Sequence, residues 1–392
     1  MKKTRILAAA CALLMLPMTF ASCGDKKEKT ESRKDESSAA VTEESSEAPE
    51  EPAPEESEAA DDSSQAEPEE QGESTINPPA WKLTTPSGKE VILVGSMHAL
   101  SEEDYPMPDE LLEAYDKADV VAFECDINKT DDEANKLVFS TMYLIDGSTF
   151  SDHISPEAYE ALSAYLDSYD LEISSFEMFA PYAVASLVDE LAVEYSELSR
   201  DLGIDQYFLD KCYDDGKEIY EVESVYFQTE MLINYSEEIY DLLFREFDGE
   251  DKDSVIENLY ELHDAWVCRD LATIEGLEDE DDEEELSEED QALIDEYNKV
   301  MVDDRNIGMA EAIEEFAEGD QQVLFIVGAA HYVGEKGIIA LLEADGYEPV
   351  PLEYKNPARI TPKEHTDDDS SAAEESSEAE ASSTADSSSA KE

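Results

Sequence analysis

The sequence predicts an α/β fold, with a central, mostly parallel or mixed β-sheet that is flanked by helices. Residues 91–94 and 323–327 are apolar and rich in β-branched side chains, as in strands buried on both faces of a parallel sheet. Strand and helix patterns also alternate towards both ends of the folded region. Between these two ends we expect a large all-helical insertion.

The elements of the first half follow from local patterns. A short strand and a turn at residues 81–89 lead into the first buried strand, and a helix is expected near residues 108–118. Residues 120–123 form a second buried strand, which ends at Glu124. A helical pattern begins at Ser155, a capping residue followed by proline, and runs to about residue 200.

The second half is predicted in the same way. A helix over residues 203–214 ends at Gly216, and residues 217–223 alternate as a strand that ends at Glu223. Helices are expected over residues 227–239, 254–276 and about 287–316. A strand over 322–327, a helix over 337–344 ended by Gly346, and a strand over 347–352 complete the fold.

The two ends of the chain differ in composition from the middle. Residues 1–22 have a basic start, an apolar stretch and small residues before Cys23, as in a secretory signal peptide of the lipoprotein type. Lipidation of Cys23 would hold the chain on the extracytoplasmic face of a cell membrane, whereas an ordinary cleaved signal is the alternative. Residues 23–76 form an acidic tether and residues 363–392 an acidic tail, both expected to be disordered. One domain is expected over residues 77–362.

The net charge argues against one class of partner, and the cysteine content argues against two kinds of site. The net charge of −76 argues against nucleic acid, because phosphate binding needs a basic surface. After removal of the leader and lipidation of Cys23, three cysteines remain, and no Cys-x-x-Cys occurs: Cys125, Cys212 and Cys268. Their spacing indicates neither a disulfide framework nor a thiolate zinc site, and their disulfide status stays open, as does the oligomeric state.

The phrase Gly-x-x-His follows a buried strand twice, at Gly95 to His98 and at Gly328 to His331. Because parallel strands deliver their carboxyl ends to one edge of a sheet, we expect both histidines and Glu124 to meet there. The alternative for each histidine is a polar residue on a strand-to-helix turn. The other three histidines lack this context and receive no role.

Two imidazoles and a carboxylate at one edge predict either a divalent metal site or acid/base chemistry. Imidazole suits a divalent metal such as Mn, Co or Zn, with His98, His331 and Glu124 as ligands. A metal-activated water would then hydrolyse an amide or ester bond without a protein nucleophile. Glu124 is interpreted as a third ligand or as the general base, against a capping or salt-bridging role.

Three further side chains are candidates for supporting roles. Glu223 is predicted to contact the metal ligands and orient them, without binding the metal itself, or to position the substrate. Arg305 is predicted to hold a substrate carboxylate or to stabilise an oxyanion, with Asn306 beside it. The alternative for Arg305 and Asn306 is a salt bridge between helix and sheet.

Taken together, these residues resemble the TraB/PrgY/GumN family, which is related to the Tiki metalloproteases that cleave Wnt proteins. The resemblance covers nearly the whole folded region and includes these stretches: residues 81–83, 95–98, 203–205, 221–223, 305–306 and 328–334, with Glu124, Pro181, Lys217, Gln228, Ala265, Trp266 and Gly337. Where Arg269 stands, the family usually carries glycine. The order and spacing of the motifs carry the resemblance more than any single one of them.

The resemblance implies an α/β fold and, by analogy with Tiki, metal-dependent peptide-bond cleavage that uses His98, His331 and Glu124. The leading prediction is therefore a membrane-tethered extracytoplasmic hydrolase that acts on a peptide or protein substrate. Similar folds include erythromycin esterases and a haem-binding lipoprotein. A haem- or peptide-binding surface lipoprotein without enzymatic activity and a metal-independent esterase are accordingly the alternatives.

Overall fold

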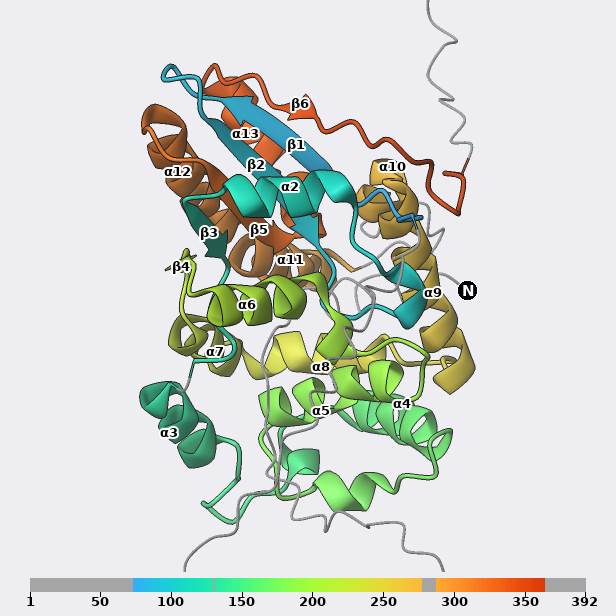
Figure 1. Cartoon of the computed structure of the whole chain (residues 1–392). Coiled ribbons are helices and arrows are strands. Elements are labelled where there is room, and N and C mark those ends of the chain that lie inside the picture. The colour runs from blue at the N-terminus through green and yellow to red at the C-terminus, as the bar shows by residue number, and fades with distance from the viewer. Residues whose placement is uncertain (1–72, 130, 277–286, 364–392) are drawn as a thin grey trace, which may run out of the picture. The chain divides into compact units, whose positions relative to one another are not determined.

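The computed structural model contains a mixed sheet, which lies in the upper half of the view in Figure 1. The described residues contribute β1 (Ala80–Thr84), β2 (Glu90–Ser96), β3 (Val120–Phe123), β4 (Glu218–Glu221), β5 (Val323–Gly328) and β6 (Val350–Pro351). Their order is β4-β3-β5-β2-β1-β6. Strands β4, β3, β5 and β2 are parallel neighbours, whereas β1 runs antiparallel to β2 and β6. The sheet confirms the predicted α/β fold.

The structure describes residues 73–129, 131–276 and 287–363, all within one compact unit. The predicted signal peptide, the lipidation site at Cys23, most of the tether and nearly all of the acidic tail lie outside these residues. In the described ranges, none of the helices combines the length and the apolar character that crossing a bilayer requires.

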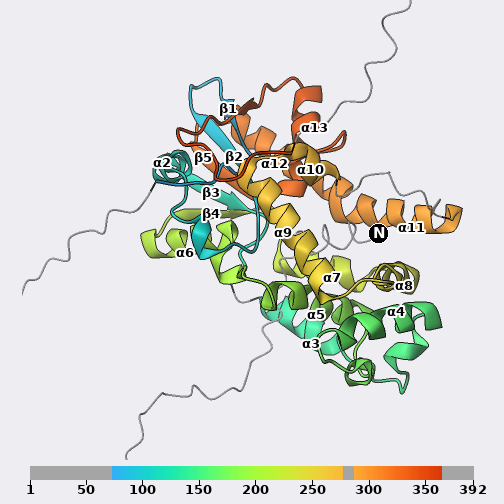
Figure 2. The same cartoon turned by 90° about the vertical axis from the view of Figure 1, so that its right-hand side faces the viewer.

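Helices cover both faces of the sheet. The side chains of Leu93 and Phe325 pack with helices α12 (Asp304–Glu318) and α13 (Ile338–Ala344) in one apolar core. Figure 2 shows α2 (Asp109–Lys117) and α6 (Ile204–Asp215) on the opposite side of the sheet. Strands β2, β3 and β5 are therefore buried on both sides, which explains their continuous apolar sequence.

The insertion is helical except where β4 returns to the sheet. It contains α3 (Asp132–Thr141), α4 (Pro156–Asp167), α5 (Pro181–Glu194), α7 (Val225–Ile233), α8 (Glu237–Arg245), α9 (Lys252–Cys268), α10 (Leu271–Glu275) and α11 (Glu288–Asn298). Helix α3 was not expected from the pattern. Its start is capped by Asp131, whose carboxylate accepts the amides of Glu133 and Ala134.

Several predicted helices are shorter in the structure. The pattern from Ser155 to about residue 200 breaks between α4 and α5, where Asp170 has a φ of 59°. The helix expected over 227–239 divides because Ser236 caps a new helix, α8. The helix expected over 254–276 ends at Arg269, which adopts the left-handed conformation with a φ of 55°.

The last third of the chain shows two further differences. The helix expected over residues 287–316 contains a π-helical turn, Lys299–Asp303, between α11 and α12. The final strand, expected over 347–352, is reduced to β6, because the chain pairs with β1 over two residues only. The π-helical turn lies directly before Arg305, and such turns frequently occur at functional sites.

Candidate functional site

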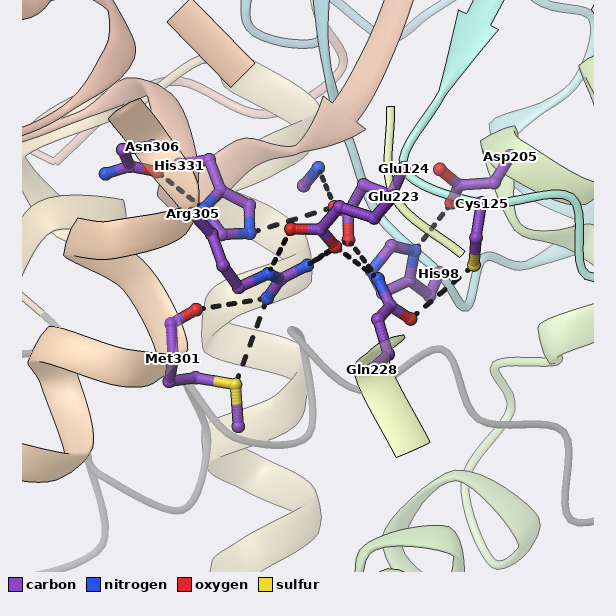
Figure 3. A network of polar contacts seen from close by, with 11 residues as sticks. His98, Glu124, Cys125, Asp205, Glu223, Gln228, Met301, Arg305, Asn306 and His331 are labelled. Carbon is purple, nitrogen blue, oxygen red and sulfur yellow. Dashed lines mark hydrogen bonds and ion pairs between the residues drawn. The ribbon is translucent and has the colours of Figure 1, made fainter. Parts of the chain in front are cut away.

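The carboxyl ends of four parallel strands meet at one edge of the sheet. Ser96 of β2 lies opposite Gly328 of β5, so the two Gly-x-x-His segments begin side by side. A Cβ on Gly95 would lie 2.9 Å from the Cα of Ala329, so a larger residue would push the two segments apart. Glu124 follows β3, the other neighbour of β5. The close view in Figure 3 shows the side chains that this edge collects.

His331 is held in one tautomer. Its Nδ1 lies 2.7 Å from Oδ1 of Asn306, and the amide nitrogen of Asn306 donates to the carbonyl of Lys336 at 3.0 Å. The second contact orients the amide, so the amide oxygen faces the ring and Nδ1 carries the hydrogen. The Nε2 atom of His331 is left with a lone pair, and it is buried without a hydrogen-bond partner.

The ring of His331 is neutral. Complete burial lowers its pKa well below the usual value, and the positive charge of Arg305 and the proximity of His98 lower it further, although Glu223 opposes them. Nε2 of His331 lies 3.8 Å from Oε1 of Glu124. Because the ring carries no charge, this contact is not an ion pair: two hydrogen-bond acceptors face each other.

His98 is fixed from the opposite side of the sheet. Its Nδ1 lies 2.6 Å from Oδ2 of Asp205, which stands in the first turn of α6. That turn approaches closely: Ile204 N donates to the carbonyl of Met97 at 3.1 Å, and a Cβ on Gly203 would lie 2.5 Å from the carbonyl oxygen of His98. The Nε2 of His98 and the second oxygen of Asp205 are buried without a hydrogen-bond partner.

Both oxygens of Glu124 accept hydrogen bonds, although the side chain is completely buried. Oε1 accepts the backbone amide of Gly328 at 2.7 Å, and Oε2 accepts from Arg305 at 2.6 Å and from Gln228 at 3.2 Å. Gly328 opens the second Gly-x-x-His segment. Glu124 therefore joins the end of β3 to the turn that carries His331.

Arg305 uses every N–H of its guanidinium group within the protein. Nε and Nη2 donate to the two oxygens of Glu223 at 2.9 and 3.0 Å, and Nη2 also donates to Glu124. Nη1 donates to the carbonyl of Met301 at 3.0 Å and lies 3.9 Å from its sulfur. Burial opposes the charge, but the two glutamates outweigh it and raise the pKa of Arg305. No N–H group of Arg305 is therefore left for the predicted donation to a substrate.

Gln228 of α7 completes the network. Its amide nitrogen donates to Glu223 at 2.9 Å as well as to Glu124, and its oxygen accepts from the thiol of Cys125 at 3.5 Å. Burial, together with the negative charges of Glu124 and Glu223, raises the pKa of Cys125 well above its usual value. Cys125 thus stays a thiol and is a poor nucleophile. In the described part of the chain, all three cysteines are free.

The predicted ligands reach one edge, but they do not form a ready metal cage. Among the described residues, no three histidine, cysteine or carboxylate side chains lie close enough together to hold a metal ion. Figure 3 shows His331 and His98 on opposite sides of the Glu124 carboxylate. The predicted ligand set stays a prediction, supported by the two unpartnered Nε2 atoms.

Two side chains of the site had no predicted role. Asp205 and Gln228 contribute to the family resemblance, but their local sequence predicts no contact with His98 or Glu124. Asp205 lies 107 positions from His98, and Gln228 lies 104 positions from Glu124. The sequence does contain one indication of the contact made by Asp205. This carboxylate stands in the first turn of a helix that follows Gly203, where it can face a neighbouring segment of the chain.

Comparison with known proteins gives a match to a family model. The model of the TraB/PrgY/gumN family matches residues 79–351, which include every side chain of the network described above. No curated protein and no solved structure matches the chain.

Proposed function

This chain belongs to the TraB/PrgY/gumN family, and on that premise we propose that it is a metal-dependent hydrolase that cleaves peptide bonds outside the cell. Two features support the proposal. The site contains His98, His331 and Glu124, to which the analogy with the related Tiki metalloproteases assigns peptide-bond cleavage. The donor atoms at the sheet edge also have the chemistry that a divalent cation requires.

The observation that carries the proposal is the pair of acceptors at the edge. The lone pair on Nε2 of His331 faces Oε1 of Glu124 across 3.8 Å, and both side chains are completely buried. Two buried acceptors at this separation repel each other unless a cation or a hydrogen donor lies between them. A metal ligand histidine typically donates its other nitrogen to a neighbouring group, as Asn306 and Asp205 allow here.

The charges of the network favour the same conclusion. Glu124 and Asp205 are buried and Glu223 is partly buried; Arg305, the one guanidinium of the network, contacts Glu124 and Glu223, whereas Asp205 contacts His98, and His331 adds no positive charge. Buried charges of one sign are costly without compensation, so a surplus of carboxylates favours a bound cation. His98, His331 and Glu124 would hold a divalent ion such as Mn, Co or Zn. Such an ion would supply Lewis-acid chemistry, polarising a carbonyl and activating water.

The remaining residues keep the donor atoms in place. Asp205 and Asn306 fix the two rings, so that each Nε2 points into the site. Arg305 holds Oε2 of Glu124, so Oε1, which accepts only the Gly328 amide, would be the oxygen available to a cation or a proton. Glu223 orients Arg305 and Gln228 and, by this proposal, acts through them rather than on the substrate.

Metal analysis of the full chain tests this proposal. Replacing either site histidine, in His98→Ala or His331→Ala, should lower the bound metal and abolish peptide cleavage. His153→Ala is the matched control, because His153 is only partly buried and bonds with Glu237 and Ser148. Equal metal content in all four proteins, measured by mass spectrometry of the elements, would reject the metal site.

The extracytoplasmic location depends on the leader. We propose that Cys23 carries a lipid and holds the domain at the outer face of the membrane. Cys23→Ser should release the protein from the membrane fraction and remove the lipid mass from the N-terminal peptide. If the protein with Cys23→Ser sediments with the membrane as fully as the wild type, the anchor lies elsewhere.

One observation favours a second function. The His98 and Asp205 pair has the geometry of a general base that is oriented by a carboxylate, with Nε2 free to take a proton. A metal-independent esterase would use this pair. Hydrolysis that persists in the presence of a chelator and is lost in Asp205→Ala would favour this function over the metallopeptidase.

A further inference from the structure

Residues 352–363, which we call the strap, lie beyond the end of the match to the family model. The strap contains no helix or strand, and Figure 1 shows it in red, running from β6 towards α10. The amide of Leu352 donates to the carbonyl of Ala80 at 2.9 Å, and that of Lys363 donates to the carboxylate of Asp270 at 3.1 Å. The strap is therefore fixed to the domain at both ends.

Three cations of the strap, spaced four residues apart, contact carboxylates of the domain. Lys355 and Lys363 have side chains that are 62% and 60% exposed, and their glutamate partners lie at the surface. Such exposed pairs contribute little to stability. Arg359 differs, because its side chain is only 23% exposed and donates to the completely buried carboxylate of Asp104 at 2.6 Å. Arg359 is thus the cation of the strap that reaches the interior.

Arg269 holds the first part of the strap. Its guanidinium donates to the carbonyl of Leu352 at 2.7 Å and lies 5.6 Å from the ring centre of Tyr354, whose hydroxyl donates to the carbonyl of Pro78 at 2.9 Å. The backbone of Arg269 is left-handed, a conformation in which glycine is less strained, and the family usually carries glycine there. The contact with the strap gives a physical reason for arginine at this position.

Asp104 collects donors from three parts of the chain. Its carboxylate accepts the amide and the hydroxyl of Ser101 at 2.7 and 2.9 Å, and it lies 2.9 Å from Nε2 of His263 in α9. Burial opposes its charge, but these contacts and the one with Arg359 outweigh burial and hold the pKa of Asp104 well below its usual value. A buried carboxylate that loses a cationic partner is costly, so the segment around Asp104 depends on Arg359.

The residue that follows Asp104 connects this segment to the start of α6. Tyr105 donates its hydroxyl to the carbonyl of Leu202 at 2.7 Å, and its ring centre lies 5.4 Å from that of Tyr207. Leu202 and Tyr207 stand on either side of Asp205 in the sequence. The segment around Asp104 therefore packs against the turn of α6 that orients the first histidine of the site.

The same segment leads directly to His98. Residues 98–104 begin with this histidine and end with Asp104. Between them, Leu100 is completely buried and pairs with Ser199 through two backbone hydrogen bonds of 3.1 and 2.8 Å. A packed segment of this kind does not rearrange at one end alone, so we expect a change at Asp104 to reach His98.

We propose that the strap positions His98 and Asp205 for the reaction, with Arg359 as its positioning residue. The inference rests on the proposed function, in which these two side chains act, and adds to it an element outside the family match. Arg359 acts through Asp104 and the start of α6 and does not itself contact the site. Loss of its guanidinium should loosen residues 98–105 and 199–205 and leave the turn at residues 328–331 unchanged.

Hydrogen exchange of the full chain, followed by mass spectrometry, tests the proposal. Arg359→Met should speed exchange in residues 98–105 and 199–205 by roughly 10-fold or more, with unchanged exchange in residues 328–331. Lys355→Met is the matched control, because it removes an exposed cation of the same strap, and it should exchange as the wild type does. Arg359→Lys keeps a cation beside Asp104 and should restore most of the protection. Unchanged exchange in Arg359→Met, or equal acceleration of all three segments, would overturn the proposal.

Metal affinity separates positioning of the site from a purely structural role. In competition with a coloured chelator, Arg359→Met should bind zinc or manganese roughly 2- to 30-fold more weakly than the wild type, whereas Lys355→Met should bind it equally. Equal affinity in Arg359→Met, in spite of faster exchange, would overturn the positioning role. If the wild type binds no metal, the proposed metal site fails, and the exchange experiment alone decides whether the strap holds His98.

Arg269→Gly tests the first part of the strap. Glycine relieves the backbone at this position but removes the contact with Leu352, so exchange in residues 352–354 should become roughly 10-fold faster. The helix α9, which ends at this residue, should keep its protection. Unchanged exchange in residues 352–354 would show that Arg269 does not hold the strap.

Discussion

The two Gly-x-x-His segments look alike in sequence but hold their histidines differently. The Nδ1 of His98 is bonded to the carboxylate of Asp205, whereas the Nδ1 of His331 is bonded to the amide of Asn306. A carboxylate adds negative charge to the ring's surroundings, and an amide adds none. The same Gly-x-x-His motif thus places two imidazole rings in different electrostatic environments.

The difference extends to the next neighbours. Complete burial, together with the nearby guanidinium of Arg305, lowers the pKa of His331 well below its usual value. His98 follows a strand whose end packs against α6, and its neighbour in that helix is an anion. We infer that the Nε2 atom of His331 is a lone-pair donor, whereas His98 has an anion, Asp205, behind its ring.

Among the changes that test the difference between the two histidines, removal of the Arg305 guanidinium should have the largest effect. Arg305→Met leaves Glu124 and Glu223 buried without their cation, so the free energy of unfolding should fall by about 3–5 kcal/mol. It also removes the positive charge that lowers the pKa of His331, so this pKa should rise. Urea denaturation and NMR titration of the histidine rings measure the two effects.

Lys299→Met provides the control for that experiment. Lys299 lies six residues earlier in the same helical segment and pairs with Asp304 at the surface. An exposed pair contributes at most about 1 kcal/mol, so this variant should be nearly as stable as the wild type. Equal losses in Arg305→Met and Lys299→Met would mean that the buried network does not stabilise the fold.

Replacing the carboxylate partner of His98 by an amide should have the next largest effect. Asp205→Asn gives His98 the kind of partner that His331 has, with almost no change in shape. Loss of the carboxylate behind a metal ligand typically lowers metal affinity by roughly 10- to 100-fold, and we expect a loss of that size here. Titration with zinc or manganese in competition with a coloured chelator measures it.

Asp210→Asn is the matched control, because Asp210 lies on the exposed side of the same helix and bonds with Asn128 and Gln206. Its metal affinity should equal that of the wild type. If Asp205→Asn also binds metal as tightly as the wild type does, the difference between the partners of the two histidines does not affect metal affinity.

Local sequence was sufficient to predict the strands and the meeting of their ends. Buried parallel strands are continuous apolar runs, and the topology of parallel sheets brings Glu124 to the edge where both Gly-x-x-His segments end. The partners of the histidines could not be predicted in this way. Which carboxylate faces His98 depends on where α6 packs, and that is decided by contacts over 107 positions.

Arg305 illustrates the same limit at the level of charge. Its sequence position predicted either a substrate contact or a salt bridge, and nothing in the local pattern distinguishes them. The structure directs all its donors to Glu124, Glu223 and Met301. Helix ends were misjudged for a related reason: Ser236 caps a new helix, and Arg269 takes a left-handed conformation that usually favours glycine.

The pH dependence of stability gives the smallest and most specific test of the neutral His331. Its folded pKa lies well below the unfolded value of about 6.5, so below that pH only the unfolded chain binds a proton there. The free energy of unfolding of the metal-free protein should therefore fall by about 1.4 kcal/mol per pH unit as the pH drops below 6.5 towards the folded pKa. His331→Gln should remove this part of the slope, and His153→Gln should keep it. Parallel slopes for the wild type and His331→Gln, from urea denaturation between pH 7 and pH 5, would show that the folded protein does not lower the pKa of His331.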